Sequence, residues 1–382
     1  MKVAAEAERL RRQGIDIVDL GAGEPDFPTP AHVVDAARRA LDAGFTKYTT
    51  NAGIEELRSA VCARYRADYG IDYTPAEVIV TAGGKQALYN TTLALFGAGD
   101  EVITHAPGWP TIPEQVKLAD ATPVIVRTHM EDGFRPDAGM FLDALTPRTK
   151  GIVINSPGNP TGALMSEDDL AAIASEAARR GIWIVLDLCY EQLIYDRVPH
   201  NLPGVLATRL RDCTVLCGSA SKSYAMTGWR CGWAVGPAEV IKACNAIQSN
   251  ATSNANSIAQ RAAVAALTGP QECVVEMLDE YRQRRDQLCD WLAADPRLRV
   301  VKPSGAFYLF IDVSDVLSPD GFRTSADLAQ ALLDKARVAL TAGEAFDAPG
   351  YLRISYAASL DRLQEGATRI LQFVRAHAGA VV

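Results

Sequence analysis

The stretch SEDDLAAIASEAARRGIWIVLDLCY (residues 166–190) contains a helical pattern followed directly by a strand pattern. Residues 166–180 carry apolar side chains at the spacing of an amphipathic helix, with charged residues between them. Residues 182–190 form an almost unbroken apolar run, which is typical of a strand covered on both faces. A helix followed at once by such a strand predicts an α/β unit with a parallel sheet.

The same alternation continues in both directions along the chain. Further strands are expected at 77–84, 100–107, 122–128, 150–157 and 214–221, with a helix at 85–96. We therefore expect an α/β fold in which a mostly parallel sheet lies between helices. In such sheets ligands bind beyond the carboxyl ends of the strands, so the residues at these ends are the first candidates for a site.

The C-terminal part of the chain has a different character. A long helical stretch near 254–292 is followed by strand patterns at 298–314 and 351–357 and by helical patterns at 325–338 and near 360–376. This mixture predicts a smaller α+β domain.

Composition argues against several classes of function. The chain has 382 residues and a formal net charge of −8, which disfavours binding to nucleic acids or to anionic membranes. No apolar stretch approaches the roughly 20 residues that span a bilayer. The start MKVAAEAERLRRQG has the pattern of a helix and not of a secretory signal. The eight cysteines form no CxxC pair and no Cys/His spacing of a metal site, so we expect free thiols in a reducing cytoplasm and no metal.

Three of the predicted strands end in residues that suit a ligand. The string VIVTAGGKQAL ends a strand at Gly83 and Gly84 and opens a helix near Lys85, where backbone N–H groups would suit a phosphate, although a plain turn reads the same way. The loop of IVINSPGNPTG presents either the amide of Asn159 or only an Asn-Pro turn. Asp187 ends the strand 182–190 and needs a cationic or hydrogen-bonding partner, either in a site or in a structural ion pair.

The segment SASKSYAMTGWR (219–230) carries the most specific chemistry. Ser219, Ser221 and Arg230 supply the hydroxyls and the guanidinium that a phosphate dianion requires. Lys222 lies between them, and a lysine beside a phosphate site is suited to covalent bonding with a carbonyl cofactor. Taken alone, Lys222 would be read as a solvated surface residue.

Seven strings occur together in the order typical of one family and cover nearly the whole chain: GEPDFPTP, TKYTTNAGIEELRSAV, GGKQAL, NSPGNPTG, SASKSYAMTGWR, PSGAFY and YLRISYA. The chain thereby resembles the class I pyridoxal-phosphate aminotransferases of fold type I, in particular their bacterial aspartate and aromatic amino-acid branch. The resemblance implies a large cofactor-binding domain, residues 31–284, with a mostly parallel seven-stranded sheet between helices. It implies a smaller α+β domain made of residues 1–30 and 285–382, and pyridoxal 5′-phosphate as the cofactor.

The resemblance also implies roles for single residues at the reacting end of the cofactor. Lys222 would bind the cofactor covalently and move the proton during catalysis. Asp187 would pair with the ring nitrogen and keep it protonated. Tyr190 and Asn159 would hydrogen-bond the ring oxygen O3′, and Trp109 would stack on the ring.

The remaining implied roles concern the phosphate and the substrate. Gly84, Lys85, Ser219 and Arg230 would hold the phosphate, the first two mainly through backbone N–H groups. Arg353 would clamp the α-carboxylate of the substrate, helped by the backbone of Gly23, with Trp109 and Asn159 also next to the substrate. Tyr48 would reach the phosphate of a neighbouring subunit, which implies a homodimer with shared active sites.

Several functions are compatible with these residues. The leading hypothesis is ping-pong transfer of an amino group from an L-amino acid to a 2-oxo acid, with aspartate and 2-oxoglutarate as the first choice. Aromatic amino acids, prephenate or another side chain are alternatives, and a C–S lyase would use the same cofactor. A ligand-sensing regulator is disfavoured, because it would need a DNA-binding domain in front of a pattern that begins within the first helical turns.

Three departures from the family pattern limit the transfer of roles. The chain begins late, without an arm that in many relatives packs on the partner subunit. Cys189 takes a position near the cofactor ring where relatives often have alanine or isoleucine, and we expect a modest effect of Cys189→Ala. The region 248–260 lacks the arginine that animal-type enzymes use for the distal carboxylate of the substrate, a role for which Lys85 or a mobile polar residue is a candidate.

Overall fold

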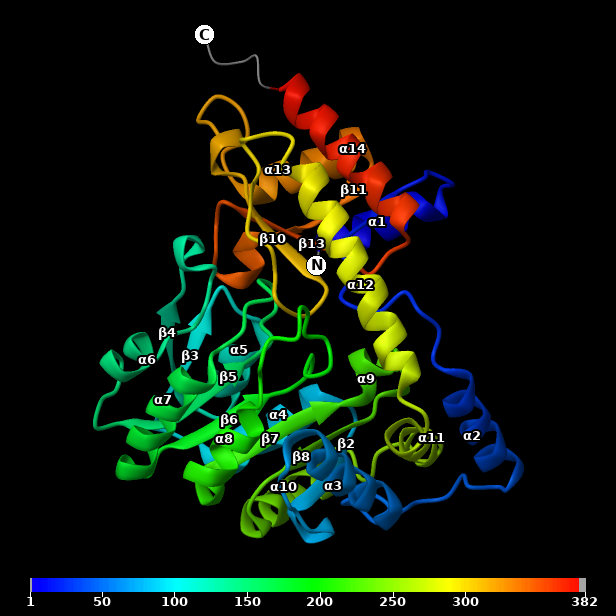
Figure 1. Ribbon diagram of the computed structural model, residues 1–382, viewed down its shortest axis with the longest axis vertical. Coiled ribbons are helices and arrows are strands. Elements are labelled where there is room, and N and C mark those ends of the chain that lie inside the picture. The colour runs from blue at the N-terminus through cyan, green and yellow to red at the C-terminus, as the bar shows by residue number, and fades with distance from the viewer. Residues whose placement is uncertain (1, 378–382) are drawn as a thin grey trace.

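A seven-stranded sheet is the framework on which the site is built. In the computed structural model, which describes residues 2–377, the strand order is β2-β8-β7-β6-β5-β3-β4 (Figure 1). The strands are β2 (Val78–Thr81), β3 (Glu101–Ala106), β4 (Thr122–Arg127), β5 (Thr149–Asn155), β6 (Trp183–Asp187), β7 (Thr214–Ser219) and β8 (Gly232–Val235). All run parallel except β8, which is antiparallel to both of its neighbours. The predicted α/β class and mostly parallel sheet are confirmed.

Sequence patterns locate six of these strands and miss β8. Its four residues lie in the short string CGWAVG, which has no alternation of its own. Because β8 runs against its neighbours, it begins at the edge where they end, and Gly232 pairs with Ser219. Arg230, two residues earlier in the chain, therefore reaches the carboxyl edge of the sheet.

Alternate strand residues face two layers of helices, as expected for a sheet buried on both faces. In β6, Val185 faces one layer, while Ile184 and Leu186 face the other. The first layer contains α4 (Gly84–Leu95), α5 (Thr111–Leu118) and α10 (Ala238–Ala251). The second contains α3 (Glu55–Tyr69), α6 (Ala138–Asp143), α7 (Glu167–Arg180), α8 (Leu202–Arg209) and α11 (Ser257–Thr268), and α2 (Ala31–Asp42) packs on α11.

Helix α7 shows why the opening stretch folds as it does. The side chain of Ser166 caps its start by accepting a hydrogen bond from the backbone N–H of Asp169. Gly181 ends it in the left-handed conformation, at φ 69°. Strand β6 then begins at Trp183 but ends at Asp187, so the strand expected over 182–190 is shorter than predicted. After Asp187 the chain leaves the sheet, and Cys189 and Tyr190 lie in a turn.

The second part of the molecule contains an antiparallel sheet with the order β12-β13-β10-β9. Its strands are β9 (Arg299–Val300), β10 (Tyr308–Asp312), β12 (Thr341–Ala342) and β13 (Tyr351–Ser355), accompanied by α1 (Lys2–Arg12), α13 (Ser325–Ala331), α14 (Leu360–Ala376) and the parallel pair β1 (Val18–Asp19) and β11 (Val338–Ala339). Helix α12 (Glu272–Leu292) leads from the seven-stranded sheet to this part (Figure 1). The helix expected over 325–338 ends at Ala336: α13 continues after Ala331 as a π-helical turn, Leu332–Ala336, and β11 begins at Val338.

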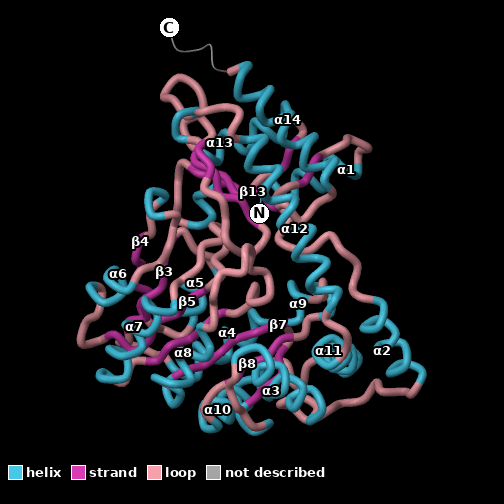
Figure 2. Tube along the Cα trace, viewed as in Figure 1, coloured by secondary structure: helices cyan, strands magenta, loops and turns pink. Residues whose placement is uncertain are grey.

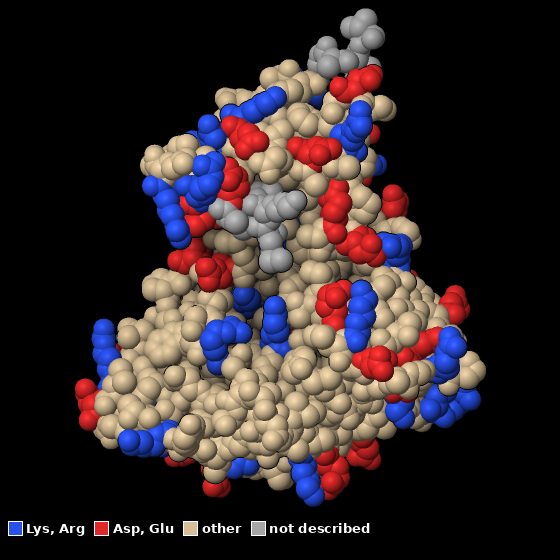
Figure 3. All heavy atoms as spheres, turned by 180° about the vertical axis from the view of Figure 1, so that it is seen from behind, with Lys and Arg blue, Asp and Glu red and all other residues tan. Residues whose placement is uncertain are grey.

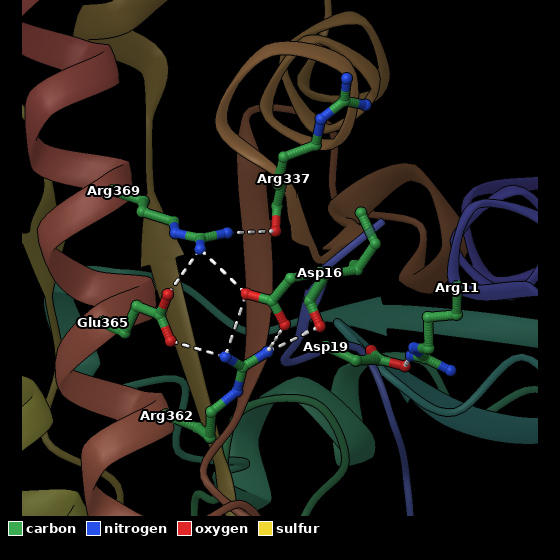
Figure 4. A network of polar contacts seen from close by, with 8 residues as sticks. Arg11, Asp16, Asp19, Arg337, Arg362, Glu365 and Arg369 are labelled. Carbon is green, nitrogen blue, oxygen red and sulfur yellow. Dashed lines mark hydrogen bonds and ion pairs between the residues drawn. The ribbon is translucent and has the colours of Figure 1, made fainter. Parts of the chain in front are cut away.

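A network of charged side chains fixes the segment before β1 to α14. Asp16 accepts hydrogen bonds from Arg362 at 2.9 Å and from Arg369 at 3.1 Å (Figure 4). Arg369 also donates to the backbone oxygen of Arg337 at 3.2 Å, and Glu365 accepts from Arg362 at 2.6 Å. Partly exposed ion pairs each contribute little stability. Together these contacts fix the position of the segment that leads to Gly21 and Gly23.

Loops gather between the two sheets (Figure 2). Among them is the NPTG turn, where a Cβ atom on Gly162 would lie 2.5 Å from the backbone oxygen of Gly305. Glycine therefore lets the loop after β5 approach the loop before β10, and the backbone oxygen of Gly162 accepts from the N–H of Gly305 at 2.9 Å. Among residues 2–377, no helix has both the length and the apolar character to cross a membrane.

Candidate active site

A cavity of about 320 Å³ lies between the carboxyl edge of the seven-stranded sheet and strands β10 and β13. Seen from behind, the surface is hollowed between the two parts of the molecule, and basic side chains line the lower rim (Figure 3). The cavity brings together every predicted site residue except Tyr48: Gly23, Gly84, Lys85, Trp109, Asn159, Asp187, Tyr190, Ser219, Lys222, Arg230 and Arg353. Tyr48 is 91% exposed and lies away from this cavity, so its role toward a second subunit stays a prediction.

One end of the cavity has the donors of a phosphate site. Helix α4 begins at Gly84, and the first N–H groups of a helix have no acceptor within it. Gly83 before it adopts φ +88°, and a Cβ atom there would lie 2.5 Å from Nη2 of Arg230. Arg230 is held by its own hydrogen bonds to the backbone oxygens of Thr227 at 2.9 Å and Ala82 at 3.2 Å. With the hydroxyl of Ser219, these groups fit a phosphate dianion.

Asp187 provides a buried carboxylate at the end of β6. It is only 4% exposed, and its Oδ1 accepts a hydrogen bond from the backbone N–H of Cys189 at 3.0 Å. Within the described residues no basic side chain forms an ion pair with it. Burial raises the pKa of Asp187 to about 7, and the bond from Cys189 offsets part of this rise. A carboxylate left in this state fits a cationic partner such as the protonated ring nitrogen of pyridoxal phosphate.

Lys222 lies on the short helix α9 (Ala220–Ser223), directly after β7. Its Nζ donates to the backbone oxygen of Gly23. Burial lowers the pKa of Lys222, and the charges of Arg230 and Arg353 lower it further, whereas Cys189 and Glu24 raise it. A lowered pKa increases the fraction of neutral amine, which is the form that attacks an aldehyde. The burial and the lowered pKa of Lys222 therefore fit a lysine that reacts with an aldehyde.

Arg353 lies opposite, on β13, and is 8% exposed. It donates to Oδ1 of Asn159 at 3.0 Å and to the backbone oxygen of Gly21 at 2.8 Å. Its guanidinium lies 4.4 Å from the ring centre of Tyr308 and 4.9 Å from that of Phe346. The Nε atom is buried and has no hydrogen-bond acceptor among the described residues. A buried cation with an unused donor fits an incoming carboxylate.

The cavity also has lining residues to which sequence reasoning gave no site role or only a passing one. They are Leu88, Asn155, Cys189, Cys217, Gly218, Ser221, Thr227 and Tyr308. Asn155 positions Asn159, because its Oδ1 accepts from the backbone N–H of Asn159 at 2.9 Å. The signals were present in the sequence: Asn155 begins NSPGNPTG and Tyr308 ends PSGAFY. The sequence alone does not show which side chains of these motifs point into the cavity.

The raised pKa of Asp187 predicts a pH-dependent stability of the cofactor-free protein. Because the folded-state pKa is about 7 against an ordinary 3.8, the folded protein holds this proton more tightly than the unfolded chain. Stability is therefore lost as the pH rises from about 4 to about 7, by about 4 kcal/mol for this group. Asp187→Asn should remove this part of the slope. Urea unfolding of both proteins across this range measures it, and the difference between them cancels other titrating groups such as Glu191, whose pKa burial raises to about 8. Parallel curves would contradict the prediction.

The chain is similar to known proteins both in sequence and in structure. The family model described as aminotransferase class I and II matches residues 15–370. The chain is 43% identical to an aspartate aminotransferase of Geobacillus stearothermophilus, covering 99% of this chain and 96% of the relative. It is 46% identical to an aspartate/prephenate aminotransferase of Thermus thermophilus, with 96% and 93% covered. The solved Thermus thermophilus aspartate aminotransferase with maleate has a TM-score of 0.91 and 44% identity, covering 98% of this chain and 95% of that one.

Proposed function

Because this chain belongs to the class I and II aminotransferases and is a pyridoxal-phosphate-dependent aminotransferase, we propose that its amino donor is L-aspartate and its acceptor 2-oxoglutarate. The observation that carries the proposal is that Arg353 and Lys85 line the same cavity as Lys222 and Arg230, the two cations proposed to hold the cofactor. Each of the two substrates carries two carboxylates, and two separated cations suit such an anion.

Each residue of the site has its own role in the proposed reaction. When bound, pyridoxal phosphate supplies an aldehyde for the amino group and a ring that accepts the electron pair released at Cα of the substrate. The phosphate is held by the N–H groups at the N-terminus of α4, by Ser219 and by Arg230. Asp187 would keep the ring nitrogen protonated, because its buried carboxylate forms no ion pair with another side chain of the described residues. Arg353 binds the α-carboxylate and thereby orients the Cα–H bond.

Lys222 acts as the proton carrier in this proposal. Its Nζ is held near the cavity by the oxygen of Gly23, and its lowered pKa allows the neutral amine to accept a proton from Cα and to return it elsewhere. Tyr190 and Asn159 donate hydrogen bonds to O3′ of the ring. Asn159 is suited to this, because its Oδ1 accepts from Arg353, which leaves the amide N–H groups as donors.

Lys85 is the proposed group for the distal carboxylate. Its Nζ lies 4.9 Å from the ring centre of Trp109, on the wall of the same cavity, and the side chain is exposed. The ammonium group therefore has the reach and the charge for a second carboxylate. Support comes from the similar Thermus thermophilus enzyme, which was solved with maleate, a dicarboxylate.

Prephenate is the second candidate acceptor. Relatives at 43% and 46% identity carry the name aspartate/prephenate aminotransferase. Prephenate also bears two carboxylates, so Arg353 and Lys85 would serve it in the same way. A panel with aspartate or glutamate as donor, and with 2-oxoglutarate, prephenate or phenylpyruvate as acceptor, ranks these substrates by kcat/KM. A preference for phenylpyruvate over both dicarboxylates would reject the proposal.

A substitution of Lys85 tests the distal site directly. Lys85→Ala is expected to raise KM for aspartate by about 30-fold, which corresponds to loss of one charge-assisted hydrogen bond. KM for phenylalanine should change little, because that side chain carries no charge. Lys117→Ala is the matched control, since Lys117 is exposed and pairs with Glu114 on α5. Equal effects on both substrates would show that Lys85 acts on the cofactor and not on the side chain of the substrate.

The same proposal includes a homodimer in the cytoplasm. The exposed Tyr48 and the phosphate end of a second copy would form part of one shared site. A large domain of residues 31–284 and a smaller one of residues 1–30 and 285–382 would meet within α12, the helix that links the two sheets. Sedimentation of the holoenzyme tests for the homodimer. The activity of mixtures that combine Tyr48→Phe subunits with Lys222→Ala subunits tests the shared site.

A further inference from the structure

Tyr308 joins the two sheets at the cavity. It is the first residue of β10 in the four-stranded sheet, it is 1% exposed, and it lines the cavity. Its hydroxyl lies 2.8 Å from the hydroxyl of Tyr190, which follows β6 of the seven-stranded sheet. The two rings pack edge to face with their centres 5.7 Å apart. The contact therefore crosses between the two parts of the molecule at the proposed O3′ site.

The ring of Tyr308 also supports the proposed carboxylate clamp. Tyr308 pairs with Ser355 and Phe310 pairs with Arg353, so Tyr308 and Arg353 are diagonal neighbours on one face of the β10–β13 ladder. The guanidinium lies 4.4 Å from the ring centre, within the range of a cation–π contact. One side chain thus touches both a group assigned to the cofactor and a group assigned to the substrate.

The hydrogen-bond inventory of the two tyrosines fixes the direction of their contact once the cofactor is bound. A tyrosine has one O–H to donate. If Tyr190 donates it to O3′, the oxygen of Tyr190 is left to accept, and the donor at 2.8 Å is Tyr308. A hydroxyl that accepts one hydrogen bond is a stronger donor in the next, because such chains are cooperative.

We propose that Tyr308 is a positioning residue that strengthens the hydrogen bond from Tyr190 to the cofactor through its hydroxyl and holds Arg353 for the substrate through its ring. The proposal rests on the proposed role of Tyr190. The proposal assigns one effect to the hydroxyl of Tyr308 and another to its ring. Loss of the hydroxyl weakens stabilisation of the deprotonated O3′ and so raises the pH at which the bound cofactor changes its absorbance. Loss of the ring weakens binding of the α-carboxylate.

Two variants separate these effects in the holoenzyme. Tyr308→Phe keeps the ring, and it should raise the pH midpoint of the cofactor absorbance change by about 0.5 while altering KM for aspartate less than about 2-fold. Tyr308→Leu lacks both groups, and it should show the same rise together with a KM about 5-fold higher, through loss of the cation–π contact. Tyr356→Phe is the control, because Tyr356 belongs to the same core cluster and donates to the oxygen of Ala306 at 3.2 Å without lining the cavity.

A double-variant cycle distinguishes this role from a structural one. In a Tyr190→Phe background, adding Tyr308→Phe should leave the midpoint where Tyr190→Phe puts it, because the relay no longer exists. A midpoint unchanged by Tyr308→Phe in an enzyme that shows the cofactor band would overturn the inference alone. An equal rise in Tyr356→Phe, or additive shifts in the cycle, would overturn it as well. A wild-type protein that shows no cofactor band at all would overturn the proposed function, and the inference with it.

Discussion

Lys222→Ala is expected to lower kcat by about 10⁴-fold, the upper end of what a positioned acid–base group contributes. The residue is expected to carry both the covalent link and the proton transfer, and no second lysine replaces it: Lys85, which also lines the cavity, has its Nζ against the ring of Trp109. The cofactor should still bind through its phosphate, since Arg230, Ser219 and the α4 start are untouched.

Borohydride reduction followed by peptide mapping measures the covalent link. In the wild-type protein the label should appear in the peptide that contains Lys222, and in Lys222→Ala no peptide should be labelled. Lys117→Ala serves as the control for the loss of an ordinary lysine, and it should be labelled at Lys222 as the wild type is. Label on another lysine of the wild-type protein would reject the assignment.

Asp187→Asn is expected to lower kcat by about 10³-fold, because the buried charge pair proposed between Asp187 and the ring nitrogen, worth about 4 kcal/mol, would be replaced by a neutral contact. Asparagine has nearly the same shape as aspartate and still accepts the N–H bond from Cys189, so the fold should persist. Without the carboxylate the ring nitrogen loses its proton, and the ring accepts electrons from Cα less readily. The same variant should be the more stable one in the cofactor-free state above about pH 7, where the wild type holds an unpaired buried charge.

The opposite signs of these two effects make the test specific. Steady-state kinetics gives the loss of activity, and urea unfolding of the cofactor-free protein gives the gain in stability. Asp212→Asn is a matched control, because Asp212 is exposed and lies just before β7, at the far edge of the same sheet. A variant that lost both activity and stability would indicate that Asp187 serves the fold and not the ring nitrogen.

Local sequence patterns predicted most of the strands and several residues of the candidate site. The apolar runs predicted six strands, and their ends marked Gly84, Asn159, Asp187 and Ser219 as neighbours, because the carboxyl ends of parallel strands share one edge. The seven ordered strings identified the family before any geometry was known. The prediction missed β8, because its four residues in CGWAVG begin with one glycine and precede another, and so lack the apolar run that marked the equally short β2.

The fold class, the family and the residues at the carboxyl edge of the sheet follow from local periodicity and from the order of motifs, so they can be predicted from the amino-acid sequence. How groups distant in the chain meet depends instead on the way whole strands and sheets pack. The reversed direction of β8 brings Arg230 to the end of the cavity proposed for the phosphate. Arg230 adopts φ 54° there, a conformation that costs a non-glycine residue about 1 kcal/mol and is maintained by its surroundings. The contact of Tyr308 with Tyr190 likewise depends on how two separate sheets pack, and no local pattern encodes the distance between them.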